Sequence, residues 1–257
     1  WISHDPSSEF VAYYKLNRGN ILEAFNDALN YFDSPAQNFV FASVSGDIAM
    51  RIQGRYPIRR PLEGKFLLDG SKTSNGWQRF VPDHQNIMDK NPPRGFVSSA
   101  NQYPVDGTYP YYITATHFEA YRNRRINKVL SSSNQITPAD MMKLQNDNYN
   151  LKAEESLPYF LSLLDSTTFT PTEKEAYRIL KSWDYVNDKN SEGASYYEAW
   201  WDNLMPLLWD EMSQEKVTLT MPTTFNTIRL LKENPKLGFF DIQQTPEKET
   251  AVEVIRK

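Results

Sequence analysis

The residues best suited to chemistry lie between Asn91 and Ile126. A short apolar run from Gly95 to Ala100 ends at Asn101, and a loop rich in Tyr and Pro then leads to Arg122 and two further arginines. Asn and Arg side chains both donate hydrogen bonds, so this stretch could bind a polar group. A polar side chain at the end of a strand, followed by a loop and a basic helix, is a common way to build a site on a rigid scaffold.

Each of these side chains also has a purely structural interpretation. Asn101 is of a type that forms a turn after a strand, and Arg122 could be an ordinary charge on a helix surface. Arg124 and Arg125 are expected to form structural ion pairs. The residues of the stretch alone leave these alternatives open.

Other chemistry has little support in the sequence. His4, His84 and His117 are dispersed, without the spacing of a metal motif such as HExxH. The chain contains no Gly-rich dinucleotide fingerprint, no phosphate-binding loop and no GxSxG nucleophile motif. Cysteine is absent, which excludes disulfides and thiolate metal sites. Carboxylates are numerous, but the sequence does not show which of them lie together.

The composition is that of a soluble globular protein of 257 residues, with 40% hydrophobic and 23% charged residues. The net charge of −4 and the scattered basic residues give no case for nucleic-acid binding. No apolar run approaches the roughly 20 residues of a membrane span. Aromatic residues make up 14% of the chain, which suits a large core and an aromatic-lined cleft.

The first 117 residues predict one helix and several short strands. Asn20 and Glu23 have the spacing of a capping box, and apolar residues follow at helical intervals up to Phe32. Two apolar runs around Ser45-Gly46 predict a β-hairpin. The expected strands are Asn38–Ala42, Ile48–Ile52, Phe66–Asp69 and Phe96–Ala100, with mostly loop over 70–94.

Residues 131–212 predict an all-helical block, and 213–257 a mixed tail with helices from about Thr223 and Pro246. Thr137 and Thr170 each precede a Pro and lie three residues before an acid, which is the pattern of a helix start. Further helices are expected over 118–130, 151–164 and 196–212. Strands and helices are segregated along the chain, so the expected fold class is α+β.

Both ends of the sequence suggest an internal piece of a longer protein. Residue one is Trp1, and no signal-peptide pattern follows it. Helical apolar spacing continues to Lys257 without a capping residue. A processed chain would give the same pattern.

A series of short motifs resembles the penicillin acylase (penicillin amidase) family. The resemblance covers nearly the whole chain, and it depends on the order and spacing of motifs that are each weak alone. They are Pro35-Ala-Gln-Asn38, Phe41-Ala42, Ser45-Gly46-Asp47-Ile48, Gly54-Arg-Tyr-Pro-Ile-Arg59, Asn91-Pro-Pro-Arg-Gly-Phe-Val-Ser-Ser-Ala-Asn101, Tyr121-Arg122, Arg125-Ile126, Leu130, Thr137-Pro138-Ala-Asp140 and Gln145-x-Asp147.

The resemblance implies an N-terminal-nucleophile hydrolase that matures by self-cleavage, with this chain as part of a four-layer αββα fold carrying a helical insert. A serine at the new N-terminus attacks an acyl amide, with its own α-amine as the base. Asn101 matches the family's strand-end Asn, which donates to the oxyanion. Arg122 matches the helix arginine that orients this Asn. The expected partners are a small-molecule acyl amide and the remaining segments of the same precursor, with neither nucleic acid nor membrane.

One departure from the family pattern is decisive for activity. Trp1 is not a nucleophile, so the serine is expected upstream and the 257 residues alone are expected to be inactive. No cofactor is required for the chemistry. Some family members bind a structural calcium ion through Asp residues, but Asp106 is the only acid near Asn101 and its spacing matches poorly, so calcium is left open.

Three further expectations follow from the resemblance. Family members are usually exported, which suggests a periplasmic location. The substrate-binding residues cannot be assigned, and the aromatic content hints only at an apolar acyl group. The alternative to an acylase is a non-catalytic ligand-binding or structural module with an acylase-like fold.

Overall fold

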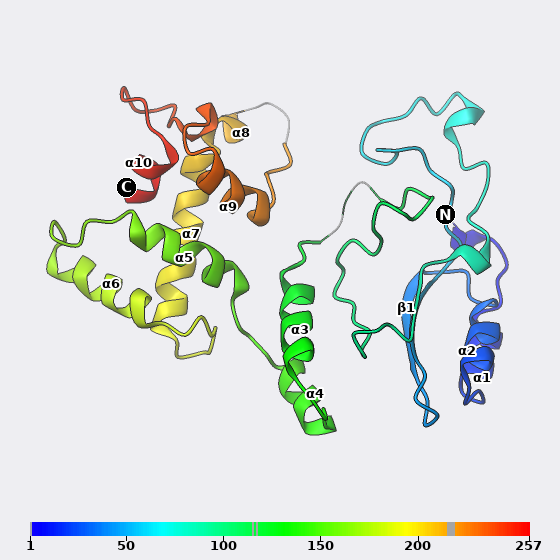
Figure 1. Cartoon of the computed structure of the whole chain (residues 1–257). Helices are drawn as coiled ribbons and strands as arrows, with labels where there is room; N and C mark the ends of the chain where they lie inside the picture. The colour runs from blue at the N-terminus through cyan, green and yellow to red at the C-terminus, as the bar shows by residue number, and fades with distance from the viewer. Residues whose placement is uncertain (1, 115, 117, 215–218) are drawn as a thin grey trace. The chain divides into compact units, whose positions relative to one another are not determined.

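The structure is a computed structural model that describes residues 2–114, 116, 118–214 and 219–257 (Figure 1). Its contacts divide the chain into two compact units, Trp1–Asn134 and Gln135–Lys257, called unit 1 and unit 2 below. Unit 1 contains α1 (Glu9–Leu16), α2 (Leu22–Leu29), β1 (Gln37–Ala42), β2 (Ile48–Gln53), β3 (Met88–Lys90) and α3 (Tyr121–Ser132), with single 3₁₀ turns at Ile2–His4, Thr73–Asn75 and Asp83–Gln85.

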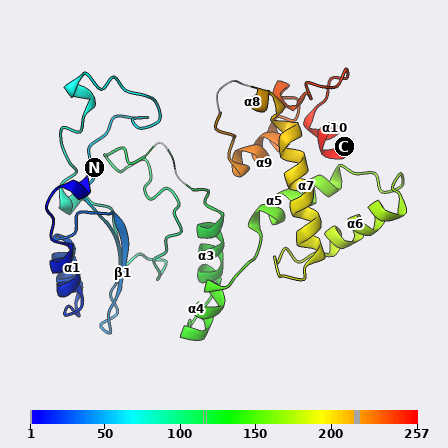
Figure 2. The same cartoon turned by 180° about the vertical axis from the view of Figure 1, so that it is seen from behind.

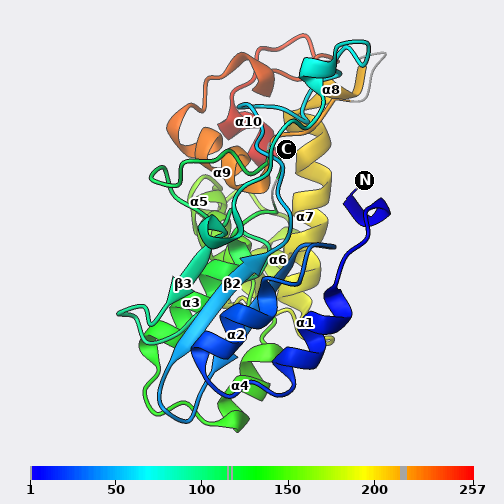
Figure 3. The ribbon, with the colours of Figure 1, turned by 90° about the vertical axis from the view of Figure 1, so that its right-hand side faces the viewer.

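The predicted hairpin is confirmed and forms the centre of unit 1. β1 pairs antiparallel with β2, and β2 pairs antiparallel with β3, so the sheet order is β1-β2-β3. Helix α2 lies against this sheet, as Figure 3 shows. Its apolar side presents Leu22, Phe25 and Leu29 to Ala49 of β2 and to two phenylalanines of β1. Burial of these side chains holds the helix on the sheet.

Two predicted strands are wrong. Phe66–Asp69 has no strand partner among the described residues, and Leu67 is fully exposed at 103%. Phe96–Ala100 likewise belongs to no strand of the described chain. An apolar run becomes a strand only when a neighbouring segment satisfies its backbone groups. Conversely, β3 lies in a stretch that was expected to be loop, because Met88–Lys90 finds β2 beside it.

The first helices also differ from the prediction. The capping box at Asn20 and Glu23 is wrong, because α2 begins at Leu22 after Ile21 and has no side-chain cap. Helix α1 has no counterpart among the predicted helices. Helix α3 begins at Tyr121, three residues later than the apolar pattern predicts.

Unit 2 is helical. It contains α4 (Pro138–Gln145), α5 (Leu151–Ser162), α6 (Pro171–Ser182), α7 (Glu192–Leu208), α8 (Asp210–Gln214), α9 (Thr224–Glu233) and α10 (Ala251–Arg256), with a 3₁₀ turn at Gly238–Phe240. The capping boxes at Thr137 and Thr170 are confirmed. Helix α7 begins four residues before the predicted Tyr196, and Ser191 caps it.

Helix α7 is the central element of unit 2. Seen from behind in Figure 2, α6 lies alongside it. The core around α7 contains residues of α5, α9 and α10, including Phe160, Leu231 and Val254. The described residues 219–257 therefore share one core with the preceding helical block.

The predicted helix start at Thr245-Pro246 is wrong. Helix α10 begins at Ala251, where Thr250 and Glu253 form its capping box. The Thr245 hydroxyl instead donates to the carboxylate of Glu249. No helix in the described parts of either unit is long and apolar enough to span a membrane.

Candidate functional site

The loop that leads to Asn101 is fixed where it leaves the sheet. Asn91 follows β3 with a left-handed backbone, φ 46°, which Asn tolerates better than most residues. Its Oδ1 accepts the N–H of Ile48 at 2.8 Å, and its Nδ2 donates to Oδ1 of Asp47 at 2.8 Å. Both side-chain hydrogen bonds are made to the hairpin turn, so they anchor the start of the segment that leads to Asn101.

Side-chain hydrogen bonds hold the segment Phe96–Ala100 to two elements, β1 and α3. Toward β1, Nδ2 of Asn38 donates to Oγ of Ser99 at 2.7 Å. Toward α3, Oγ of Ser98 donates to Oδ1 of Asn127 at 2.8 Å. The two consecutive serines therefore bind two different elements of unit 1.

The contact with α3 is a closed ring of three side chains, called the Ser98 ring below. Asn127 donates to Oδ1 of Asn123 at 3.0 Å, and Asn123 donates back to Oγ of Ser98 at 3.4 Å. Asn123 and Asn127 lie four residues apart and therefore on one helix face. The ring fixes this face of α3 against the segment that ends at Asn101.

We expect Asn123→Ala to lower the free energy of unfolding by about 1–3 kcal/mol, because Asn123 is only 9% exposed and its loss leaves partners unpaired. Chemical denaturation measures this change. Ser131→Ala, at an exposed position of the same helix, is the control and should stay within about 0.5 kcal/mol of the wild type. Equal effects of the two substitutions would contradict a positioning role for the ring.

Arg122 and Asn101, the two predicted site residues, are in direct contact. Nη2 of Arg122 donates to Oδ1 of Asn101 at 2.7 Å, across 21 positions of sequence. A guanidinium has only donors, so the amide oxygen must face Arg122 and the Nδ2 group must face away from it. Asn101 has φ 65°, and this left-handed conformation turns the chain at the site.

The two arginines that follow Arg122 were expected to form ion pairs. The guanidinium of Arg124 lies over the ring of Tyr121, with its carbon 5.7 Å from the ring centre. This is a cation–π contact within the first turn of α3. The ion pair of Arg125 remains a prediction.

Asn101 lines a cavity of about 350 Å³ in unit 1. Gln102, Pro104, Thr114, Thr116 and Phe118 complete its described wall. None of these five residues is predicted from the sequence as a site residue. Their one signal in the sequence is the Tyr- and Pro-rich loop between Asn101 and α3, which the structure folds back beside Asn101.

The residues around Asn101 do not fit a calcium site. Calcium prefers six to eight oxygen ligands. The carboxylate of Asp106 accepts from the hydroxyl and the N–H of Thr108, and these bonds hold the pKa of Asp106 below its ordinary value. Within the described residues, no group of three or more Asp, Glu, His or Cys lies together, and His117 lies outside them. No step of the chemistry below involves calcium.

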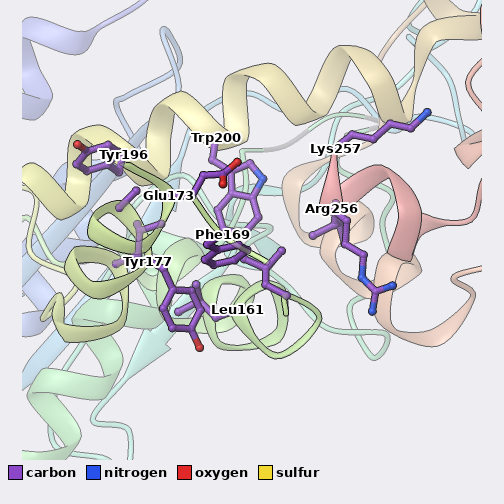
Figure 4. A pocket seen from close by; sticks show the side chains of 12 residues that line it. Leu161, Phe169, Glu173, Tyr177, Tyr196, Trp200, Arg256 and Lys257 are labelled. Carbon is purple, nitrogen blue, oxygen red and sulfur yellow. The ribbon is translucent and has the colours of Figure 1, made fainter. Parts of the chain in front are cut away.

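A second cavity of about 250 Å³ lies within unit 2 (Figure 4). Two of its charged side chains already serve the fold: Glu173 accepts the N–H of Thr170 at 2.7 Å, and Nε of Arg256 donates to the carbonyl of Leu163 at 2.8 Å. The wall is otherwise largely apolar, and it includes Leu161, Phe169, Tyr177, Tyr196 and Trp200. The donor arrangement that suits an oxyanion is the one in unit 1.

Comparisons with known proteins identify the family. The family model described as penicillin amidase matches residues 1–257. The acyl-homoserine lactone acylase QuiP of Pseudomonas aeruginosa is 22% identical, over 96% of this chain and 31% of that protein. The penicillin acylase 2 proenzyme of a Pseudomonas species is 26% identical, over 63% of this chain and 21% of that protein.

A solved structure shows the same fold. The thermostable penicillin G acylase from Alcaligenes faecalis superposes with a TM-score of 0.66 at 13% sequence identity, over 96% of this chain and 49% of that chain. The chain thus spans about half of the matched structure and less than a third of the two acylases above. By the match over its whole length, this chain belongs to the penicillin amidase family.

Proposed function

We propose that the chain is part of an N-terminal-nucleophile amidohydrolase that cleaves an acyl amide through an acyl-enzyme. Membership of the penicillin amidase family supports the reaction class. The single observation that carries the proposal is the hydrogen bond from Arg122 to Oδ1 of Asn101 at the edge of a cavity. This bond gives the Asn amide the orientation that an oxyanion donor needs.

In this proposal, the nucleophile is a serine at the N-terminus of the processed enzyme. Its α-amine, with a pKa near neutrality, takes the serine proton as the oxygen attacks the amide carbonyl. The carbonyl oxygen gains negative charge, and Nδ2 of Asn101 donates to it. As the tetrahedral intermediate collapses, the C–N bond breaks and the α-ammonium returns its proton to the leaving amine. This leaves an acyl-serine ester, which water then hydrolyses to release the acid and restore the serine.

Arg122 contributes in two ways. Its hydrogen bond to Oδ1 holds the Asn101 amide with Nδ2 facing away from Arg122. The amide therefore needs no reorientation as negative charge develops on the carbonyl oxygen of the substrate. Its permanent positive charge also favours the oxyanion, although the side chain is exposed and solvent screens that field. Asn101 itself neither gains nor loses a proton, so the proton transfers are left to the nucleophile and its amine.

The substrate class follows from the family and from the cavity. The related proteins named above are acylases for acyl-homoserine lactones and for penicillin. Pro104 and Phe118 give the cavity an apolar part that suits an apolar acyl group. The same family membership supports a four-layer αββα arrangement in the whole enzyme and export to the periplasm as parts of the proposal.

Expression of the full-length precursor tests this function. Mass spectrometry should show cleavage immediately before a serine, and the matured enzyme should hydrolyse neutral N-acyl amides. The 257-residue chain alone should show no turnover, because it has no N-terminal serine. A precursor without such a serine would instead support a non-catalytic module with an acylase-like fold.

A further inference from the structure

Gln102 has a fixed orientation next to Asn101. Its Oε1 accepts the backbone N–H of Ala100 at 2.8 Å. A backbone N–H can only donate, so the oxygen of the Gln102 amide must face Ala100 and its Nε2 group must face elsewhere. Gln102 is half-buried and lines the same cavity as Asn101.

In both side-chain amides at this cavity, the oxygen is therefore engaged by the protein and, among the described residues, the NH₂ group is not. The oxygen of Asn101 is engaged by Arg122, and the oxygen of Gln102 is engaged by Ala100. Across the part of the chain that the structure describes, neither Nδ2 of Asn101 nor Nε2 of Gln102 donates to a protein atom. The cavity wall thus offers two uncharged donors on consecutive residues.

The other described residues of the wall do not compete for these donors. The hydroxyl of Thr114 donates to the carbonyl of Thr116 at 2.8 Å and accepts the Thr116 N–H at 3.1 Å. Pro104 and Phe118 present apolar surface. A ligand that satisfies the site therefore carries two acceptor oxygens and an apolar group.

We propose that Gln102 is a substrate-binding residue whose Nε2 donates to a carbonyl oxygen on the amine side of the scissile amide. This inference rests on the proposed function, in which Asn101 serves the reacting carbonyl. The two donors lie on consecutive residues of one cavity wall, which favours a ligand whose two carbonyl groups are close together, as in an N-acyl amino-carbonyl compound. Pro104 and Phe118 suit the acyl group, and this leaves the second acceptor to the amine side.

The preferred substrate is thus an amide whose amine portion carries a carbonyl one carbon beyond the scissile nitrogen. A matched pair of substrates isolates this feature. An N-acylglycinamide has the second carbonyl, and the isobutylamide of the same acid has a similar shape without it. The wild-type mature enzyme should prefer the glycinamide, with the difference expressed mainly in KM.

Two variants of the full-length enzyme test the donor. Gln102→Glu removes the donor but keeps an oxygen that can accept the Ala100 N–H, whereas Gln102→Ala removes both. Both should lower the ratio of kcat/KM for the glycinamide to that for the isobutylamide by about fivefold, the usual value of one neutral hydrogen bond. The new negative charge of Gln102→Glu also acts on the carboxamide of the glycinamide, so Gln102→Ala, which adds no charge, is the deciding variant for the ratio.

An unchanged ratio in both variants would overturn the inference while the enzyme remains an acylase. Absence of turnover by the wild type with either substrate would instead overturn the proposed function. If the variants fail to mature, the side-chain amide signals of the wild-type enzyme give a second measurement. Addition of an N-acylglycinamide should shift the Gln102 signal, the isobutylamide should not, and equal responses to both would contradict the assignment.

Discussion

Asn101→Gly is expected to lower kcat of the full-length enzyme about 10²–10³-fold, with little change in KM. Loss of one preorganised oxyanion donor costs about 2.7–4 kcal/mol of transition-state stabilisation. Gly is the informative substitution, because Asn101 has φ 65° and Gly adopts this conformation without strain. Steady-state kinetics on a neutral N-acyl amide measures the effect.

Asn101→Ala is the matched comparison for this experiment. It removes the same donor but, unlike Gly, keeps a Cβ at a left-handed position that Ala tolerates less well than Asn, so it should lose the same activity and some stability as well. Thermal unfolding of both variants separates the two effects. Turnover within a few-fold of the wild type in Asn101→Gly would show that the amide is not an oxyanion donor.

A large effect on stability is also expected at Gly193, near the start of α7. A Cβ built there would lie 2.4 Å from Cγ of Trp183. This Trp is buried, and its Nε1 donates to the carbonyl of Val186 at 3.0 Å, so the ring has little room to move. We expect Gly193→Ala to lower the free energy of unfolding by about 1–3 kcal/mol.

The helix propensity of Ala opposes this loss by up to about 1 kcal/mol. Gly238→Ala is the control in the same unit, because a Cβ there has no neighbour within 4 Å and the backbone is not left-handed. Denaturant unfolding of both variants measures the difference. If Gly193→Ala were as stable as Gly238→Ala, the Trp183 side chain would have to move aside without loss of stability.

Local features of the fold could be predicted from the sequence. The capping boxes at Thr137 and Thr170 involve residues three positions apart, and the hairpin depends on a turn between adjacent apolar runs. Phe66–Asp69 was predicted incorrectly because pairing depends on a distant segment, which its own residues do not specify. The same reason explains why β3 was missed.

The site shows the same division. Asn101 and Arg122 could be found because their flanking motifs resemble a family pattern, and the structure places them in contact. Gln102 could not be identified in this way, because the direction of its side-chain amide depends on the N–H of Ala100 in the folded loop. The Ser98 ring could not be predicted from the sequence either. Its members come from the segment before Asn101 and from a helix more than 20 residues away.

The most direct test of the account is a double-mutant cycle on Asn101 and Arg122 in the full-length enzyme. If Arg122 acts by orienting Asn101, then Arg122→Ala should lower kcat in the wild-type background and have little further effect once Asn101 is Gly. The predicted double variant has nearly the kcat of Asn101→Gly alone. Fully multiplicative losses in kcat would contradict the proposal that Arg122 acts on the oxyanion through Asn101.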